Sequence, residues 1–127
     1  MKHKKLLSIL LLICISFNIN ADEAANHIRI QQVPKGGTHF DLPIPADQPE
    51  VYYDSNTQEI IVDGDDDGFV SYYDVEIYPS ASAVPVISTQ IDGDYDTIDV
   101  SSLSVGDYTI IIYSPYNHEF EGEFAIE

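Results

Sequence analysis

The sequence predicts an all-β sandwich, and three observations support this prediction. Segments rich in Val, Ile and Tyr recur about every ten residues from Glu50 onward, with Gly, Asp, Asn and Pro between them. No segment has a helical period of apolar residues over a useful length. The stretch Leu103–Ile110 has the spacing Leu-x-x-Gly-x-Tyr-x-Ile where a strand begins. Together these features indicate one small β domain.

The first 21 residues predict a secretory signal peptide. They begin with a lysine-rich stretch, continue with the apolar segment Leu6–Phe17 and end at the small residue Ala21. This apolar segment is too short to span a membrane. Acylation of Cys14 is the less favoured alternative, because Ile13 stands where a lipoprotein site has Gly or Ala. We therefore expect export to the periplasm, the outer surface or the medium.

Export would remove the only cysteine and leave a very acidic chain. Without a disulfide, the domain would be held by its core or by bound ions. All 22 acidic residues follow Ala21, but only Arg29 and Lys35 are basic there, so the formal charge is 2 − 22 = −20. This excludes nucleic acid as a partner, because phosphate binding needs a basic patch. It also disfavours anionic membranes and leaves cations or basic proteins, unless the charge serves only solubility.

These features divide the chain into three predicted parts. Residues 1–21 are the signal peptide, and residues 22–49 are an N-terminal strand at Ile28–Gln31 with a Pro/Gly-rich connection. Residues 50–127 are the core of the sandwich. The strands expected in this core are Val51–Ser55, Gln58–Gly64, Phe69–Tyr78, Val84–Ile91, Tyr95–Val100, Gly106–Tyr113 and His118–Glu127.

Alternation along these strands predicts which residues face the core. One face of each strand is apolar, whereas the other face of the last strand is a row of Glu. The acidic row would also discourage pairing with the edge of another chain. The expected inward residues are Tyr73, Val75, Ile77, Tyr108, Ile110, Ile112, Phe120, Phe124 and Ile126.

Leu103–Ile110 resembles the tyrosine corner of immunoglobulin-type domains. In that motif a Tyr near the start of strand F turns its hydroxyl back onto upstream backbone. The resemblance makes Tyr108 the corner residue and places Ile110 where an antibody domain has its second Cys. It implies a single immunoglobulin-like sandwich of seven to eight strands, in which apolar packing replaces the disulfide.

Tyr72–Ile126 is also similar to a family of short secreted sandwich proteins of unknown function from Gram-negative gut anaerobes. The similar segments are YYDVEIY, VISTQIDGDYDTIDVSSL, Gly106–Ile110 and Phe120–Phe124. This resemblance implies a fold and no activity. A weaker similarity, in the pattern IDVSSL…G.Y, is to the C-terminal sorting domains of the type IX secretion route. It implies a stand-alone sorting-domain-like protein as an alternative, although those domains follow a cargo domain and usually end in a basic tail.

The segment that starts at Asp63 matches the calcium-loop pattern D-x-D-x-D-G with a carboxylate at position twelve. Asp63, Asp65 and Asp67 would supply oxygen ligands, which Ca²⁺ prefers. Asp74, at position twelve, would lie about 17–20 Å from Gly68 along an extended strand, so it would not close the same site. The alternative is an ordinary Asp/Gly turn. Asp92–Asp96 is a second, weaker acidic loop of the same kind.

No pattern favours catalysis. The three histidines that follow Ala21 lie in separate segments, and none are at zinc-ligand spacing. The sequence after Ala21 has no cysteine nucleophile, no Gly-x-Ser-x-Gly elbow and no phosphate-binding Gly loop. Glycosidases use two carboxylates, but with 22 acidic residues many pairs could be proposed, so this pattern carries no information. We therefore expect a protein that is not an enzyme.

A binding surface is the more specific hypothesis. If Phe69–Tyr78 and Gly106–Tyr113 are neighbours in one sheet, an aromatic patch rimmed by acids faces outward. Such a patch would suit a protein or carbohydrate partner at the cell envelope, and the absence of Trp favours protein. The alternative is that these residues are ordinary strand formers. The outward set also includes Thr109, and the residues predicted for the partner surface are Tyr72, Tyr78, Ile111 and Tyr113.

The predicted function is therefore a secreted, non-enzymatic binding or accessory module of the envelope or cell surface, with an unknown ligand. The alternative is a calcium-stabilised structural module, in which the acidic loops serve stability.

Overall fold

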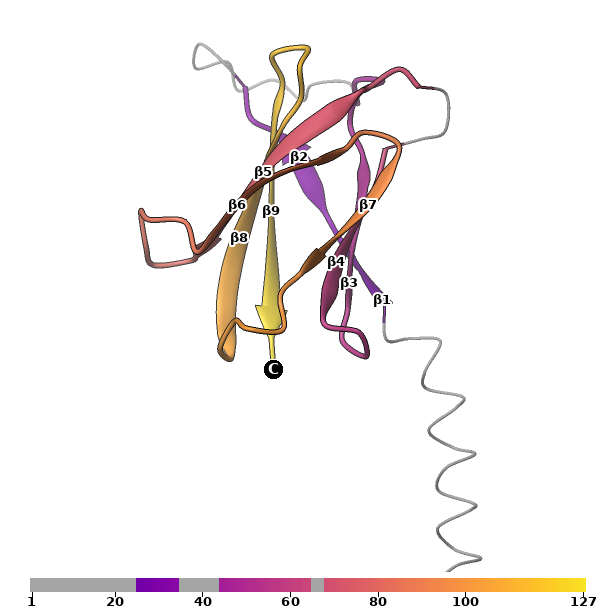
Figure 1. Cartoon of the computed structure of the whole chain (residues 1–127). Helices are drawn as coiled ribbons and strands as arrows, with labels where there is room; N and C mark the ends of the chain where they lie inside the picture. Colours follow the sequence, from indigo (N-terminus) through magenta and orange to yellow (C-terminus); the bar gives the residue numbers. More distant parts are fainter. Residues whose placement is uncertain (1–24, 35–43, 65–67) are drawn as a thin grey trace, which may run out of the picture.

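The computed structural model describes residues 25–34, 44–64 and 68–127, which form two facing β-sheets (Figure 1). One sheet has the order β1-β3-β4-β7 and the other β2-β9-β8-β5-β6, and all pairings are antiparallel. The strands are β1 Ala25–Ile28, β2 Ile30–Gln32, β3 Glu50–Asp54, β4 Glu59–Asp63, β5 Tyr72–Pro79, β6 Ile87–Asp92, β7 Tyr95–Asp99, β8 Gly106–Tyr113 and β9 Glu119–Ile126. The all-β sandwich prediction is confirmed, with nine described strands instead of seven or eight. The predicted signal peptide lies outside the described residues.

The additional strand arises because the N-terminal segment passes from one sheet to the other at Arg29. In β1, Ile28 lies opposite Val51 of the four-stranded sheet. In β2, Ile30 lies opposite Gly122 of the five-stranded sheet. A Cβ at Gly122 would lie 2.8 Å from the Arg29 carbonyl oxygen, so a residue without a side chain lets the crossing segment approach β9. The sequence predicts one strand here because both isoleucines fit the same alternation.

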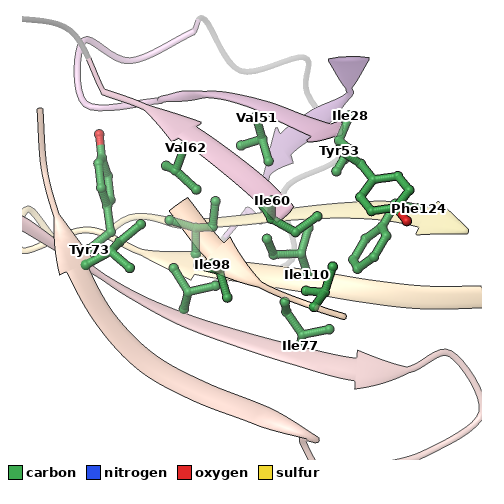
Figure 2. Packing of buried hydrophobic residues seen from close by; sticks show 14 of the residues in the cluster. Ile28, Val51, Tyr53, Ile60, Val62, Tyr73, Ile77, Ile98, Ile110 and Phe124 are labelled. Carbon is green, nitrogen blue, oxygen red and sulfur yellow. The ribbon is translucent and has the colours of Figure 1, made fainter. Parts of the chain in front are cut away.

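The core lies between the sheets and consists of the inward rows that alternation predicts (Figure 2). All nine predicted inward residues of β5, β8 and β9 are buried. Full burial of one such apolar side chain contributes about 1.5–3 kcal/mol of transfer free energy. The four-stranded sheet faces them with Val51, Tyr53, Ile60, Val62 and Ile98.

The tyrosine corner is confirmed. The Tyr108 hydroxyl donates a hydrogen bond to the Ser104 carbonyl oxygen at 2.6 Å, and its ring stacks on Phe124 at 5.6 Å. Ile110 of β8 and Ile60 of β4 are fully buried in the same cluster, from opposite sheets (Figure 2). Apolar packing therefore occupies the place of the cross-sheet disulfide, as the resemblance implies.

The expected strand at 69–78 starts three residues too early. Residues before Tyr72 carry the chain from one sheet to the other instead of pairing in a strand. There Val70 is buried, and the Ser71 carbonyl accepts a hydrogen bond from the Gly93 N–H. Phe69 stacks on Tyr116 with ring centroids 4.7 Å apart.

Across the three described ranges, no helix has the length and apolar character needed to cross a membrane.

Candidate binding face on the five-stranded sheet

The candidate site lies on the outward face of β5 and β8, the two strands whose inward residues form the core. Ile111 of β8 lies opposite Glu76 of β5 on one side and Glu121 of β9 on the other. Tyr78 lies two residues after Glu76, and Tyr113 two residues after Ile111, so both point to the same face as these two. We call the set Glu76, Tyr78, Ile111 and Tyr113 the Glu76 face.

Two tyrosines of the Glu76 face lie close to one carboxylate. The Tyr78 hydroxyl donates to Glu76 Oε2 at 3.0 Å, a bond that lays its ring along β5. Tyr113 lies near enough to Glu76 for the carboxylate to raise the Tyr113 pKa. Tyr78, Ile111 and Tyr113 are half-buried, so the face is largely apolar with a carboxylate among the side chains.

Both tyrosine pKa values are raised above the ordinary value near 10. For Tyr113 the main cause is partial burial, followed by the hydrogen bond to Glu76 and the charges of Glu76 and Glu119. For Tyr78 the main cause is the hydrogen bond to Glu76. Both phenols are therefore neutral hydrogen-bond donors at physiological pH.

Three of the four residues that the sequence predicts for a partner surface come together, whereas Tyr72 lies apart. Tyr72 is the first residue of β5 and is paired with Asp92 of β6. It lies two positions beyond the end of the β5–β8 pairing, which stops at Asp74 opposite Tyr113. Tyr72 is 37% exposed and belongs to the margin of the surface.

Acidic side chains surround the Glu76 face. They point outward from β5 and β9, on strands that adjoin β8 on either side. Arg29 is the only Lys or Arg within the described ranges, and it lies beside β2, at the far edge from β6. The face therefore presents negative charge to a partner. The surrounding carboxylates are Asp74, Glu119, Glu121 and Glu123.

The predicted calcium ligands are only partly placed. Asp63 is exposed at the end of β4, whereas Asp65 and Asp67 lie outside the described residues. Asp74 lies within β5 and accepts a hydrogen bond from the Gln90 side chain at 3.1 Å, so it belongs to the sheet and not to the loop. In the described ranges no three His, Cys, Asp or Glu side chains are grouped so that they could hold a metal ion.

The second acidic loop is a turn whose carboxylates bond its own backbone. Asp92 Oδ1 accepts from the Asp94 N–H at 3.0 Å, and Asp96 accepts from the N–H groups of Asp92 and Thr97. This turn packs against the end of β4, where the Gly64 N–H donates to the Asp94 carbonyl at 2.9 Å. The two acidic segments are therefore neighbours in space.

Sequence reasoning missed a buried polar cluster of Asp47, Ser114 and His118. Asp47 is 2% exposed and lies between the Ser114 hydroxyl, which donates to it, and the His118 imidazole. Because the carboxylate separates the serine from the histidine, the histidine is not placed to take the serine proton, and this is not a nucleophile relay. Asp47 is 71 residues before His118, and no spacing motif indicates such a contact.

Of the comparisons with known proteins, the one with solved structures supports the fold, and none gives an activity. No protein-family model matches the sequence, and no curated protein matches it. Among solved structures, the chain is similar to a DUF3244 family protein with an immunoglobulin-like β-sandwich fold from Bacteroides vulgatus. The TM-score is 0.59 and the identity 14%, over 81% of this chain and 99% of that chain. The predicted immunoglobulin-like sandwich is confirmed, and the predicted resemblance is confirmed at the level of fold.

Proposed function

We propose that this protein is a non-enzymatic binding or accessory module of the cell envelope or surface, and that the Glu76 face contacts a protein partner. The observation that carries this proposal is the grouping of Tyr78, whose hydroxyl bonds Glu76, with half-buried Ile111 and Tyr113 on one outward face. Tyrosines held in this way lose little conformational freedom when a partner binds. Aromatic residues are also enriched in protein–protein interfaces.

The charge of the face favours a basic partner. Four further carboxylates surround Glu76, and complementary charge raises the association rate and excludes acidic partners. A glycan is less favoured, because the tyrosine rings lie over the sheet and the chain has no Trp to form a flat platform. Location outside the cytoplasm is inferred from the Lys-rich and apolar first 21 residues.

A pull-down from the envelope fraction of the source organism tests the proposal. The variant Tyr78→Thr/Tyr113→Thr removes both rings and keeps residues that suit strands. Its matched control, Tyr52→Thr/Tyr95→Thr, removes two tyrosines from the outward face of the four-stranded sheet. We expect the first variant to lose the proteins that the parent captures, and the control to retain them. Capture of the same proteins by both variants would contradict the proposal.

Calcium stabilisation is the second candidate function, and the contact between the two acidic segments favours it. The hydrogen bond from the Gly64 N–H to the Asp94 carbonyl brings the end of β4, with Asp63, next to the Asp92–Asp96 turn. If Ca²⁺ binds there, the melting temperature in millimolar Ca²⁺ will exceed that in EDTA, because a ligand of the folded state stabilises it. Overlapping melts would reject this candidate and leave the binding proposal intact.

A further inference from the structure

Strand β6 is an open edge beside a groove between the sheets. It pairs only with β5, and the five-stranded sheet ends there. On the same side, β7 ends the four-stranded sheet, and a short turn joins the two edge strands (Figure 1). The groove between them is lined by apolar Ile87, Ile91 and Ile98 and by polar side chains, among them Thr89, Asp96 and Thr97. Thr89 is exposed although it points to the inner side, because no described strand covers it.

At two residues of β6 the backbone N–H and C=O groups point away from β5, toward the open edge. The Gly93 N–H donates to the Ser71 carbonyl, one position beyond the pair Tyr72–Asp92. Hydrogen-bonded pairs alternate along antiparallel strands, so Thr89 also points its N–H and C=O at β5. Ser88 and Gln90 must then point theirs away from the sheet.

The next N–H along β6 that points away from β5, that of Asp92, already has a hydrogen-bond acceptor. The Asp92 N–H donates to the Asp96 carboxylate at 2.9 Å, which closes the turn into β7. This bond also confirms that even-numbered residues of β6 point away from β5. A partner strand would therefore find its hydrogen-bonding groups at Ser88 and Gln90.

The other described edges are better protected against strand addition. Proteins block edge strands with charged residues, proline or short length. β1 has four residues and β2 has three, and the β7 edge carries Asp96 and Asp99. The segment Ile87–Ile91, in contrast, is longer than β1 and β2 and contains no charged residue and no proline. It is the longest stretch of a described edge strand without these protective features.

We infer that β6 binds an extended segment of a partner protein by β-strand addition, and that this segment alternates apolar and basic residues. The inference rests on the proposed function, because it names how a protein partner docks. Apolar side chains of the added strand would enter the groove beside Thr89. The alternate side chains would lie on the outward face next to Ser88 and Gln90.

Charge complementarity selects Lys or Arg for those alternate positions. Ser88 is paired with Glu76 and Gln90 with Asp74, so the outward row of an added strand lies one strand away from two carboxylates. A second copy of this chain would bring carboxylates toward carboxylates at the same edge, which opposes self-association. A basic extended segment meets no such repulsion, and its Lys or Arg side chains would reach from the edge toward the Glu76 face.

The test uses isotope-labelled protein and synthetic heptapeptides of alternating Lys and Val. We expect the alternating peptide to shift the Ser88 and Gln90 amides in NMR spectra and to slow their hydrogen exchange. A peptide of the same composition in two blocks and a peptide N-methylated on the residues that face β6 should each bind at least about tenfold more weakly. The block peptide directs Lys toward the groove, and the N-methylated peptide loses backbone hydrogen bonds.

Protein variants supply the matched control. Ser88→Pro removes an outward N–H, and Ser88→Lys keeps it but adds a charge that repels the peptide, so either should weaken binding. Gln31→Lys makes the same kind of change on β2, the opposite edge of the same sheet, and should have little effect. Equal binding of all peptides, or loss with Gln31→Lys alone, would overturn strand addition at β6.

Two further outcomes separate this inference from the proposed function. If the peptide shifts residues of the Glu76 face and leaves β6 unchanged, strand addition is wrong and the binding face stands. If sedimentation shows a dimer that the peptide dissociates, the natural occupant of β6 is a second copy, and the proposed segment is wrong.

Discussion

The imidazole Nδ1 of His118 lies 2.7 and 2.8 Å from the two carboxylate oxygens of Asp47, although 71 residues separate them in the sequence. Asp47 also accepts from the buried Ser114 hydroxyl, and its backbone carbonyl accepts from the Tyr73 hydroxyl at 2.7 Å. These bonds attach the segment before β3 to β5 and to the turn between β8 and β9. The carboxylate is thus a structural centre at one end of the sandwich.

Replacing this carboxylate should destabilise the fold. Asp47→Ala leaves the buried Ser114 hydroxyl without its acceptor, and we expect the free energy of unfolding to fall by about 2 kcal/mol in urea denaturation. Asp107→Ala changes an exposed aspartate and should have an effect within about 0.5 kcal/mol. Equal stabilities of the two variants would show that Asp47 has no structural role.

The tyrosine corner provides a milder test. Tyr108→Phe removes the hydroxyl that bonds Ser104 and keeps the ring against Phe124. We expect a loss of about 1 kcal/mol in the free energy of unfolding, which is the typical net value of one hydrogen bond. Tyr95→Phe, at a side chain that is 54% exposed, is the control and should be neutral. A neutral Tyr108→Phe would mean that the corner does not contribute to stability.

Close backbone contact between the two acidic segments predicts a strict requirement for glycine at position 64. A Cβ at Gly64 would lie 1.8 Å from the Gly93 carbonyl oxygen, which requires the backbone to move. Gly64→Ala should therefore cost about 1–3 kcal/mol or more through overpacking. At Gly68 no atom of the described residues, its chain neighbours aside, lies within 4 Å of an added Cβ. The φ of +72° still opposes Ala, and Gly68→Ala should cost less than Gly64→Ala. Thermal melts that reverse this order would contradict the contact.

The raised tyrosine pKa values predict a loss of stability at high pH. The unfolded chain ionises its tyrosines near pH 10, whereas folded Tyr78 and Tyr113 keep their protons to higher pH. The folded state then binds more protons, so stability is complete below about pH 10 and falls as the pH rises beyond it. Glu76→Gln should lower the Tyr78 pKa most, because its hydrogen bond is the main cause there, and the Tyr113 pKa less.

Carbon NMR of the tyrosine rings during an alkaline titration measures both values. Glu59→Gln removes a carboxylate from the four-stranded sheet and should leave both tyrosines unchanged. If Glu76→Gln also leaves them unchanged, the two tyrosines do not lie close to Glu76, and the geometry of the face is wrong.

The inward rows and the tyrosine corner could be predicted from sequence because both depend on local spacing. A strand alternates its faces with a period of two, so Tyr73, Val75 and Ile77 are sorted correctly whatever their neighbours are. The corner links Tyr108 to Ser104, four residues earlier, and its motif is therefore continuous in the sequence. The pairing of β5 with β8 follows from the immunoglobulin-type strand order.

Other features depend on contacts that no local pattern contains. The environment of Tyr113 on β8 depends on Glu76, which lies on the neighbouring strand β5. The bond between Asp47 and His118 joins distant segments. The crossing of the N-terminal segment at Arg29 depends on which sheet has room for each isoleucine, and the alternation of Ile28 and Ile30 is the same in either case.

Site-specific photo-crosslinking tests the central claim, contact of the Glu76 face with a protein partner, most directly. The probe p-benzoylphenylalanine is placed at Ile111 or, in the matched control, at Ile61. Both are half-buried isoleucines that point outward from inner strands of opposite sheets. We predict that the probe at position 111 links an envelope protein in cells and that the probe at position 61 does not. Absence of a product at position 111, or the same product at both positions, would contradict the claim.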